Sequence, residues 1–404
     1  MLYQMYEAQR AMLAPMRAFS RIAEASIPHF GYGTESLRAG YELWERFGLT
    51  HERPPFGIAS VAVNGREVAV HEEAAATTPF ATLLHFRKET DRPQPRVLVV
   101  APLSGHFATL LRGTIRTMLP EHDVYVTDWH NARDVATRHG RFGVDEYIEH
   151  VIGFLQRLGP GAHVVAVCQP CVTVLAAVAV MAQANDPAQP SSMTLMAGPV
   201  DTRSNPTSVN VLAKTKPLAW YERNLIDSVP WQYRGAGRRV YPGFIQVTAF
   251  MNMNLERHVK AHRDLFGYVA EGDREGAATI RAFYDEYFAV FDLTAEFYLE
   301  TVRTFFQEDA LARGALTFRG RPVDTGAIER TALLTIEGEN DDICGLGQTF
   351  AAHELCANLP AARKRHHVQA HVGHYGVFNG ARWQSEIYPL VRETIAETTG
   401  VPAA

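Results

Sequence analysis

Short apolar runs alternate with longer segments of helical character along much of the chain. The runs at 96–101 and 163–167 are almost continuously apolar, as is typical of strands buried on both faces of a parallel sheet. Two alternating runs meet at Asn64-Gly65, a strong short-range signal for a β-hairpin. Further strand-like runs lie at 82–86, 123–128, 193–198, 331–336 and 367–372. This strand–helix alternation predicts an α/β fold with a doubly wound, mostly parallel sheet.

Two stretches of the chain interrupt this alternation. Residues 1–50 predict amphipathic helices rich in Met, Tyr, Phe and Leu, which Pro15 and Pro28 are expected to break. Strand–helix alternation also stops near Asp201 and resumes at Thr331, and the intervening residues predict helices dense in aromatic side chains. We therefore expect an N-terminal helical segment (1–50), an α/β core (51–201 and 325–396) and a helical, aromatic-rich cap (202–324). The cap would be inserted between the sixth and seventh strands.

The composition narrows the class of protein. Hydrophobic residues make up 47% of the chain and charged residues 21%, as in a globular protein. The net charge of −5 and the lack of a basic run argue against nucleic-acid binding. Four cysteines in 404 residues do not form a disulfide framework and indicate a reducing compartment. No apolar stretch reaches the ~18 residues of a membrane span, and no signal-peptide pattern opens the chain, so we expect a cytoplasmic protein.

Cys168 lies where the apolar run at 163–167 ends and a helix of small residues begins. The first N–H groups of a helix lack intrahelical partners, and they and the helix dipole lower the pKa of a thiol there. An α/β-hydrolase holds its nucleophile at such a turn, and the next amide, here that of Gln169, can stabilise an oxyanion. Ala166 and Pro170 stand where glycines are usual, so a buried structural cysteine is the alternative interpretation of this motif alone.

This fold also predicts a carboxylate after a later strand. Asp341 follows the run at 331–336 and is preferred to Asp342, because the turn that begins at Gly338 places it first. Asp201 is a weaker candidate and is expected to be a helix cap or a contact to the cap. In the catalytic role, the Asp341 carboxylate would orient an imidazole and stabilise its cationic form.

The histidine of such a set is expected after the last strand. His374 lies in a loop bounded by Gly373 and Gly376 and is preferred to His371, which falls inside the predicted strand 367–372. His374 would take the thiol proton and later give it to the leaving alcohol. A second oxyanion donor is expected from the loop 102–106, with the Ser104 amide as the best candidate and a plain strand–helix turn as the alternative.

No metal or cofactor is expected. His258 and His262 have the four-residue spacing of helical metal ligands, but a third ligand is missing and a solvated helix face is the preferred interpretation. The histidines near the last strand would point to opposite faces of it; they are His366, His367, His371 and His374. The chain has no Walker or dinucleotide-binding glycine motif.

The remaining cysteines have structural interpretations. Cys171 lies one turn into the helix that follows Cys168 and is expected to pack beneath the turn. Cys344 and Cys356 are expected to be inert thiols.

Seven sequence blocks carry a resemblance to a known family: 101–113, 124–133, 165–170, 196–203, 283–287, 337–344 and 373–380. With these blocks the chain resembles the intracellular polyhydroxyalkanoate (polyhydroxybutyrate) depolymerases of bacteria, from its N-terminus to about residue 395. The resemblance implies an α/β-hydrolase fold and a triad of Cys168, Asp341 and His374. It also implies hydrolysis of amorphous polyester granules in the cytoplasm to 3-hydroxybutyrate oligomers and monomer, with the granule surface as partner.

Two other functions are weighed against this one. Polyhydroxyalkanoate synthases are acyl transferases that share the fold and the Cys–Asp–His set, but glycines surround their cysteine where this chain has Ala166 and Pro170. They also tend to have a substantial N-terminal region that this chain lacks. A non-catalytic granule-surface protein would use the N-terminal segment and the aromatic insertion for adhesion. Chain-length preference, cleavage mode and oligomeric state, a homo-oligomer included, are left open.

Overall fold

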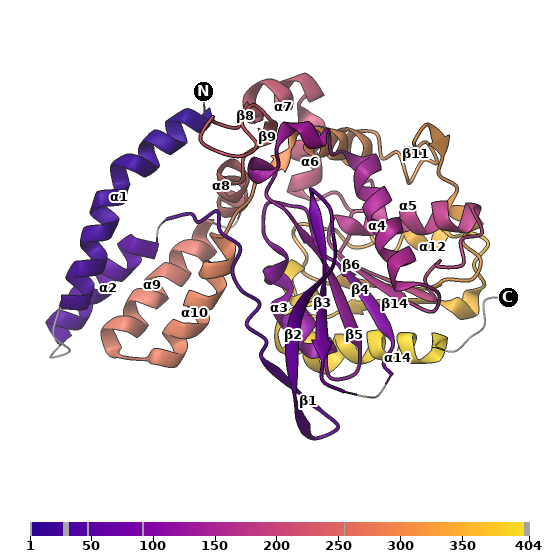
Figure 1. Cartoon of the computed structure of the whole chain (residues 1–404), viewed down its shortest axis with the longest axis horizontal. Coiled ribbons are helices and arrows are strands. Elements are labelled where there is room, and N and C mark those ends of the chain that lie inside the picture. The colour runs from indigo at the N-terminus through magenta and orange to yellow at the C-terminus, as the bar shows by residue number, and fades with distance from the viewer. Residues whose placement is uncertain (1, 27–31, 47, 91–92, 254, 400–404) are drawn as a thin grey trace.

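A nine-stranded sheet forms the centre of the computed structural model, which describes residues 2–26, 32–46, 48–90, 93–253 and 255–399 (Figure 1). The order in the sheet is β1-β2-β3-β5-β4-β6-β7-β13-β14. The strands are β1 (Ser60–Val63), β2 (Arg66–Thr77), β3 (Ala81–Lys88), β4 (Arg96–Val100), β5 (Asp123–Trp129), β6 (His163–Val167), β7 (Ser192–Met196), β13 (Ala332–Gly338) and β14 (Lys364–Gln369). The pairs from β5 to β14 are parallel, whereas β1, β2 and β3 pair antiparallel.

The sheet agrees with the sequence pattern in its main features. Counted from β2, the strands occur in the order 1-2-4-3-5-6-7-8, and the hairpin β1–β2 turns at Asn64-Gly65. All five residues of β6 are buried, which explains its unbroken apolar run. Helices cover both faces of the sheet: α4 (Val144–Leu158) packs on α5 (Pro170–Gln183), while α3 (Arg112–Met118) and α14 (Tyr388–Thr398) lie on the other side (Figure 1). The expected doubly wound, mostly parallel fold is confirmed.

A long, mainly helical insertion joins β7 to β13, the sixth and seventh strands in this count. Its helices are α6 (Ser208–Thr215), α7 (Leu218–Leu225), α8 (Gly243–Met253), α9 (Leu255–Glu271), α10 (Arg274–Tyr287) and α11 (Ala295–Thr301). The sequence did not predict its short strands, which are β8 (Asp227–Ser228), β9 (Arg239–Tyr241), β10 (Leu293–Thr294), β11 (Thr317–Phe318) and β12 (Arg321–Pro322). We propose the division expected from the sequence: an N-terminal segment (1–50), a core (51–201 and 325–396) and an insertion (202–324).

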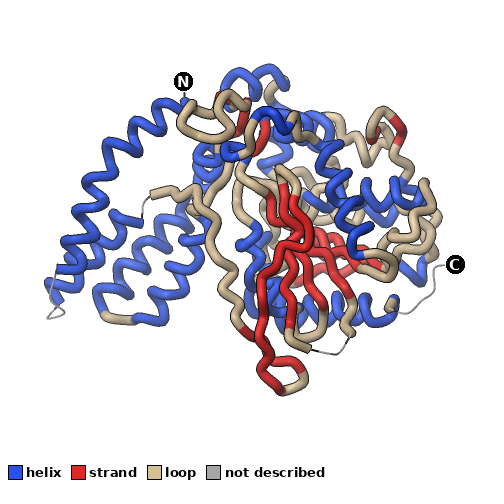
Figure 2. The backbone as a smooth tube through the Cα atoms, viewed as in Figure 1, coloured by secondary structure: helices blue, strands red, loops and turns tan. Residues whose placement is uncertain are grey.

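The N-terminal segment forms two helices, α1 (Leu2–Ser26) and α2 (Tyr32–Arg46). Helix α1 packs on α2, α2 on α9, and α9 on α10. These four helices, which we call the arm, extend to one side of the sheet-containing body, as Figure 2 shows. The expected break at Pro15 is wrong: Pro15 lies inside α1, where the turns on either side continue past the single missing N–H. Pro28 lies outside the described residues.

The last strand differs from its predicted bounds. It spans Lys364–Gln369 rather than 367–372, because it pairs in parallel with β13 from Leu333 opposite Lys364 to Gly338 opposite Gln369. As the edge strand of the sheet it tolerates the polar residues that hid its start in the sequence. Among the described helices, none is both long and apolar enough to cross a membrane.

Candidate active site

Cys168 occupies the turn between β6 and α5 in a strained conformation. Its φ of 66° lies in the left-handed region that non-glycine residues rarely adopt. The Cys168 N–H donates to the carbonyl oxygen of Met196 (2.8 Å), and the Cys171 N–H donates to the Cys168 carbonyl oxygen (3.0 Å). Pro170 begins α5, where its missing N–H has no cost. Cys168 is half-buried, whereas the other three cysteines are buried.

Asp341 and His374 come together after the last two strands of the sheet. Asp341 follows β13, and its Oδ1 accepts hydrogen bonds from the N–H groups of Ile343 (2.9 Å) and Cys344 (2.8 Å). His374 follows β14, and its Nδ1 lies 2.8 Å from Asp341 Oδ2. Only 5% of the His374 side chain and 1% of the Asp341 side chain are exposed. The carboxylate is therefore held by the backbone and in turn orients the imidazole.

The imidazole of His374 also interacts with Cys168. Burial alone would lower the pKa of His374, but the charges of Cys168 and Asp341 and hydrogen bonds to both side chains raise it well above its usual value. A proton acceptor that the carboxylate stabilises in its charged form thus stands beside the thiol. This is the arrangement needed to generate a thiolate nucleophile.

Tyr375 is a neighbour of the site that the sequence did not single out. Burial, followed by the proximity of Cys168, raises the pKa of its phenol, so the hydroxyl stays neutral. The Tyr375 ring lies edge-on to the ring of Phe283 in α10. The signal in the sequence that could have identified Tyr375 as a neighbour of the site is its position directly after His374.

The loop after β4 is held by the insertion. The Ser104 carbonyl oxygen accepts a hydrogen bond from Gln246 Nε2 in α8, and the Gly105 carbonyl oxygen accepts one from the Phe291 N–H (2.9 Å). Gly105 has a φ of 87°, and an added Cβ would press on the Gln246 amide. No described residue accepts a hydrogen bond from the N–H of Ser104 or of Gln169. Gln246 lies 142 residues from Ser104, and no local pattern predicts this contact.

The alternative carboxylates lie elsewhere. Asp342 is exposed. Asp201 binds the guanidinium of Arg203 (2.8 and 2.7 Å) and accepts its N–H, so it caps its own turn. The expectation that His371 lies within the last strand is wrong: it follows the strand with a φ of 60°, and 78% of its side chain is exposed.

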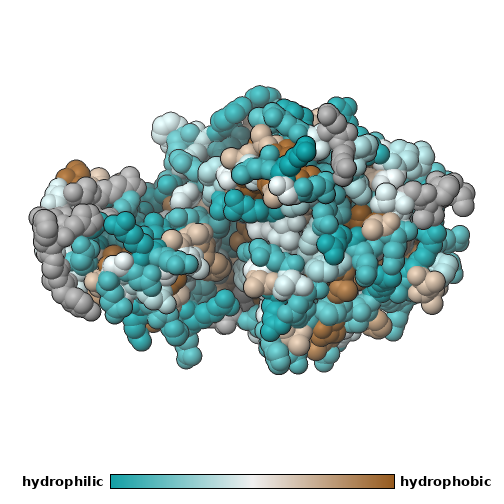
Figure 3. Space-filling model, turned by 90° about the horizontal axis from the view of Figure 1, so that it is seen from below, coloured by the Kyte–Doolittle hydropathy of each residue, from teal (hydrophilic) through white to brown (hydrophobic). Residues whose placement is uncertain are grey.

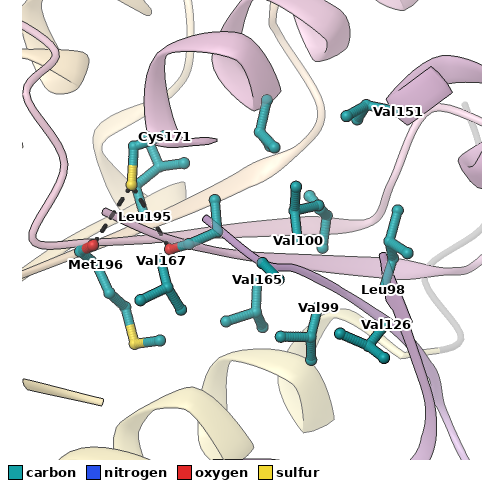
Figure 4. Close-up of a cluster of buried hydrophobic side chains, with 14 of the residues drawn as sticks. Leu98, Val99, Val100, Val126, Val151, Val165, Val167, Cys171, Leu195 and Met196 are labelled. Atoms are coloured by element: carbon teal, nitrogen blue, oxygen red, sulfur yellow. Dashed lines mark hydrogen bonds between the residues drawn. The ribbon is translucent and has the colours of Figure 1, made fainter. Parts of the chain in front are cut away.

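Cys171 packs beneath the turn, as expected. Its Sγ donates to the carbonyl oxygens of Ala166 and Met196 at 3.5 Å each (Figure 4). Burial raises the pKa of Cys171 and of Cys344 well above the usual thiol value, and it raises the pKa of Cys356 to about 12. These three thiols are therefore held in the neutral, unreactive form.

The histidine pair of α9 is part of an aromatic cluster. His258 is buried and its Nδ1 hydrogen-bonds the Tyr284 hydroxyl (2.8 Å), so the expected solvated helix face is wrong for this residue. His262 Nδ1 donates to the His258 carbonyl oxygen (2.8 Å). Across the described residues, no three His, Cys, Asp or Glu side chains gather in a way that could hold a metal ion.

A family model described as PHB de-polymerase C-terminus matches residues 197–399, which is half of the chain. The chain belongs to this PHB depolymerase family. The matched region includes Asp341 and His374 and begins after Cys168. As a member of this family, the protein is an ester hydrolase.

Solved structures give more distant likenesses. A thermophilic esterase from Thermogutta terrifontis is 12% identical (TM-score 0.41; 84% of this chain and 98% of that one are covered). A meta-cleavage product hydrolase from Pseudomonas fluorescens IP01 is 16% identical (TM-score 0.42; 84% and 97%). A monoacylglycerol lipase from Paleococcus ferrophilus is 12% identical (TM-score 0.42; 76% and 96%). No curated protein sequence matches the chain significantly.

Proposed function

We propose that this protein hydrolyses the ester bonds of poly(3-hydroxybutyrate) and related short-chain polyhydroxyalkanoates to 3-hydroxybutyrate oligomers and monomer. The proposal depends on one observation: Cys168, at a strained strand–helix turn, interacts with the hydrogen-bonded pair His374–Asp341 in a chain of the PHB depolymerase family. The proposed place of action is the surface of polyester granules in the cytoplasm. No metal or cofactor takes part.

The first half of the proposed reaction forms a thioester. His374 takes the proton of the Cys168 thiol, and the thiolate attacks the ester carbonyl carbon. The amides of Ser104 and Gln169 stabilise the negative charge on the carbonyl oxygen. The bond to the alcohol oxygen then breaks, and the His374 imidazolium donates its proton to that oxygen. The hydroxyl-ended fragment leaves, and the acyl group stays on Cys168.

The second half releases the acid. His374 takes a proton from water as the water oxygen attacks the thioester carbonyl. The thiolate of Cys168 leaves and recovers the proton from His374, and the carboxylic acid product departs. Asp341 stabilises the imidazolium in both halves without itself being protonated.

The direct test is release of 3-hydroxybutyrate from amorphous poly(3-hydroxybutyrate) particles. Cys168→Ala is expected to reduce the release to the level without enzyme, because no other described cysteine is exposed enough to attack a polymer. Release at the wild-type rate by this variant would contradict the proposed nucleophile.

Asp341→Asn with Asp342→Asn as its matched control tests the orienting carboxylate. Asp341→Asn is expected to lower kcat by about 10³–10⁴-fold, because the amide cannot stabilise the imidazolium. The neighbouring exposed Asp342→Asn is expected to stay within about twofold of wild type. Equal losses in the two variants would reject the assignment of Asp341.

The acyl transferase alternative has its own test. With 3-hydroxybutyryl-CoA as the only substrate, we expect no insoluble polymer. Polymer formation with stoichiometric release of free CoA would overturn the hydrolase proposal.

A further inference from the structure

Helix α1 has an apolar side that nothing in the described structure covers. Of the α1 residues whose burial is described, only Tyr3 and Ser20 are buried. Met5, Met12, Met16 and Phe19 are spaced seven, four and three residues apart, so they line one side of the helix, and between 53% and 70% of each is exposed. We call these four residues the apolar stripe. Exposed apolar residues in such a row mark a surface that is buried by something else.

Helix α2 extends this surface. The stripe residues Met16 and Phe19 face Leu37 and Trp44 across an open groove of about 550 Å³ between the two helices. Leu37 and Trp44 are themselves exposed. Figure 3 shows hydrophobic atoms at the outer end of the arm, among hydrophilic ones. The groove is therefore an apolar surface with both walls accessible from outside.

Exposed apolar side chains are concentrated in the arm and the insertion across the described molecule. Of 17 exposed large hydrophobic residues, 15 lie in 1–50 or 202–324, and only Phe350 and Val368 belong to the core. Three of the five tryptophans are exposed, and all three lie in these parts: Trp44, Trp220 and Trp231. The exposed large apolar side chains of the described residues thus lie almost entirely in the N-terminal segment and the insertion, and hardly at all in the core.

The charge of the two helices indicates what kind of surface they fit. Helices α1 and α2 contain five arginines and five glutamates, so their charges cancel; the residues are Arg10, Arg17, Arg21, Arg38, Arg46, Glu7, Glu24, Glu35, Glu42 and Glu45. Helices that bind anionic membranes carry an excess of Lys and Arg on the polar face. A balanced helix pair with an apolar stripe instead fits an uncharged apolar surface.

We infer that the apolar stripe, with Leu37 and Trp44, docks the protein on the surface of a solid, uncharged polyester particle. This inference rests on the proposed function, because it names the surface through which a solid substrate is held. The arm is continuous with the active site: Phe283 of α10 contacts Tyr375, which follows His374, and α10 packs on α9, α9 on α2, and α2 on α1. Docking through α1 would therefore tether the active site to the same particle.

The test compares two double variants of the full-length chain. Met12→Glu/Phe19→Glu places two charges in the apolar stripe. Ala11→Glu/Ala18→Glu adds the same charges at exposed positions of the same helix outside the stripe. The probes are pelleting with amorphous poly(3-hydroxybutyrate) particles and hydrolysis of a soluble 3-hydroxybutyrate trimer. None of the four positions belongs to the catalytic set, and circular dichroism checks that α1 still folds.

The stripe variant is expected to lose at least about tenfold in particle affinity, because each charged side chain replaces one that would bury apolar area. The control variant should pellet like wild type, and both should hydrolyse the trimer at the wild-type rate. Wild-type pelleting by the stripe variant would overturn the inference. So would a wild-type dimer, seen by light scattering, that only the stripe variant dissociates, or stripe-dependent binding to phosphatidylglycerol vesicles. Stripe-dependent pelleting without any hydrolysis would instead leave docking intact and reject the proposed function.

Discussion

At the scale of single residues, Gly198 shows how closely the structure packs beneath the nucleophile. Gly198 lies just after β7, and a Cβ there would collide with the side chain of Cys171 and approach the Cys168 carbonyl oxygen to 2.8 Å. The Gly198 N–H donates to Thr349 Oγ1 (2.8 Å), and the same hydroxyl donates to the Gly198 carbonyl oxygen (2.9 Å). Because the N–H and the carbonyl oxygen of Gly198 are both hydrogen-bonded to Thr349, movement of this residue away from the turn would break these bonds.

Gly198→Ala is therefore expected to lower the free energy of unfolding by about 1–3 kcal/mol and to lower kcat by displacing Cys168. The matched control is Gly153→Ala in α4, where a Cβ meets nothing within 4 Å. That variant is expected to gain about 0.5–1 kcal/mol, because alanine is the better helix residue. Urea unfolding and ester hydrolysis measure both effects. Wild-type stability and rate in Gly198→Ala would show that the turn has room to relax.

The sequence could predict residues whose signal is local or ordered along the chain. Cys168 was found from the change of pattern around it, and Asp341 and His374 from their order after two strands. Gln246 and the packing of Gly198 were missed, because each depends on residues far away in the sequence. The catalytic roles of Cys168, Asp341 and His374 stay predictions, whereas their positions side by side are features of the fold.

At the scale of elements, helix α1 is attached to the insertion by its first turns. The Tyr3 ring packs edge-on against Phe244 of α8, and its hydroxyl donates to Asp292 Oδ2 (2.8 Å). Asp292 is fully buried and also accepts the N–H of Gly243 (2.9 Å). Burial raises the pKa of Asp292 to about 6, although these hydrogen bonds and the charge of Arg133 oppose the shift.

This anchor makes a pH-dependent contribution of known sign. Between its unfolded pKa near 4 and its folded pKa near 6, Asp292 keeps a proton in the folded state that the unfolded chain has lost. Its contribution to stability is therefore present at low pH and falls as the pH rises through about 6, by an amount on the order of 3 kcal/mol. Asp292→Asn removes this titration, so its melting temperature relative to wild type should be higher at pH 7.5 than at pH 5. If the melting temperatures of wild type and Asp292→Asn changed in parallel with pH, the proposed titration of Asp292 would be contradicted.

Element boundaries were the least predictable feature. Pro15 was expected to end a helix, yet one missing hydrogen bond is tolerated within the 25 residues of α1. The start of β14 was missed because its polar residues acquire strand geometry from pairing with β13. Among the short strands of the insertion, β9 and β10 pair from distant parts of the sequence and so leave no local pattern. Strands β11 and β12 form a local hairpin, but each has only two residues, too few for an alternating pattern to show.

At the scale of the whole molecule, buried histidines give the stability a pH dependence opposite in sign to that of Asp292. Burial is the main cause that lowers the pKa of His51 to about 3 and those of His106, His122 and His163 to about 4. Each stays neutral in the folded state at a pH where the unfolded chain, with pKa values near 6.5, is already protonated. Their contribution to stability is present above about pH 6.5 and is lost as the pH falls toward 4.

Unfolding is therefore expected to take up as many as about four protons in this range, so the melting temperature should fall steeply from pH 7 to pH 5. His106→Gln keeps a donor for the Tyr287 carbonyl oxygen, which His106 Nε2 contacts at 3.1 Å, and should give a shallower slope. The exposed His139→Gln serves as the control and should leave the slope unchanged. A flat pH profile in wild type would show that these side chains titrate normally.

The backbone at Cys168 has a consequence for engineering. With a φ of 66°, this position disfavours every side chain by on the order of 1–3 kcal/mol, and glycine is the residue that adopts it freely. A library screened for heat resistance alone would thus be enriched in glycine at position 168 and would yield robust but inert protein. Laboratory evolution of this chain must therefore measure turnover and thermal tolerance in the same round, because a glycine at position 168 would raise the stability and remove the proposed nucleophile.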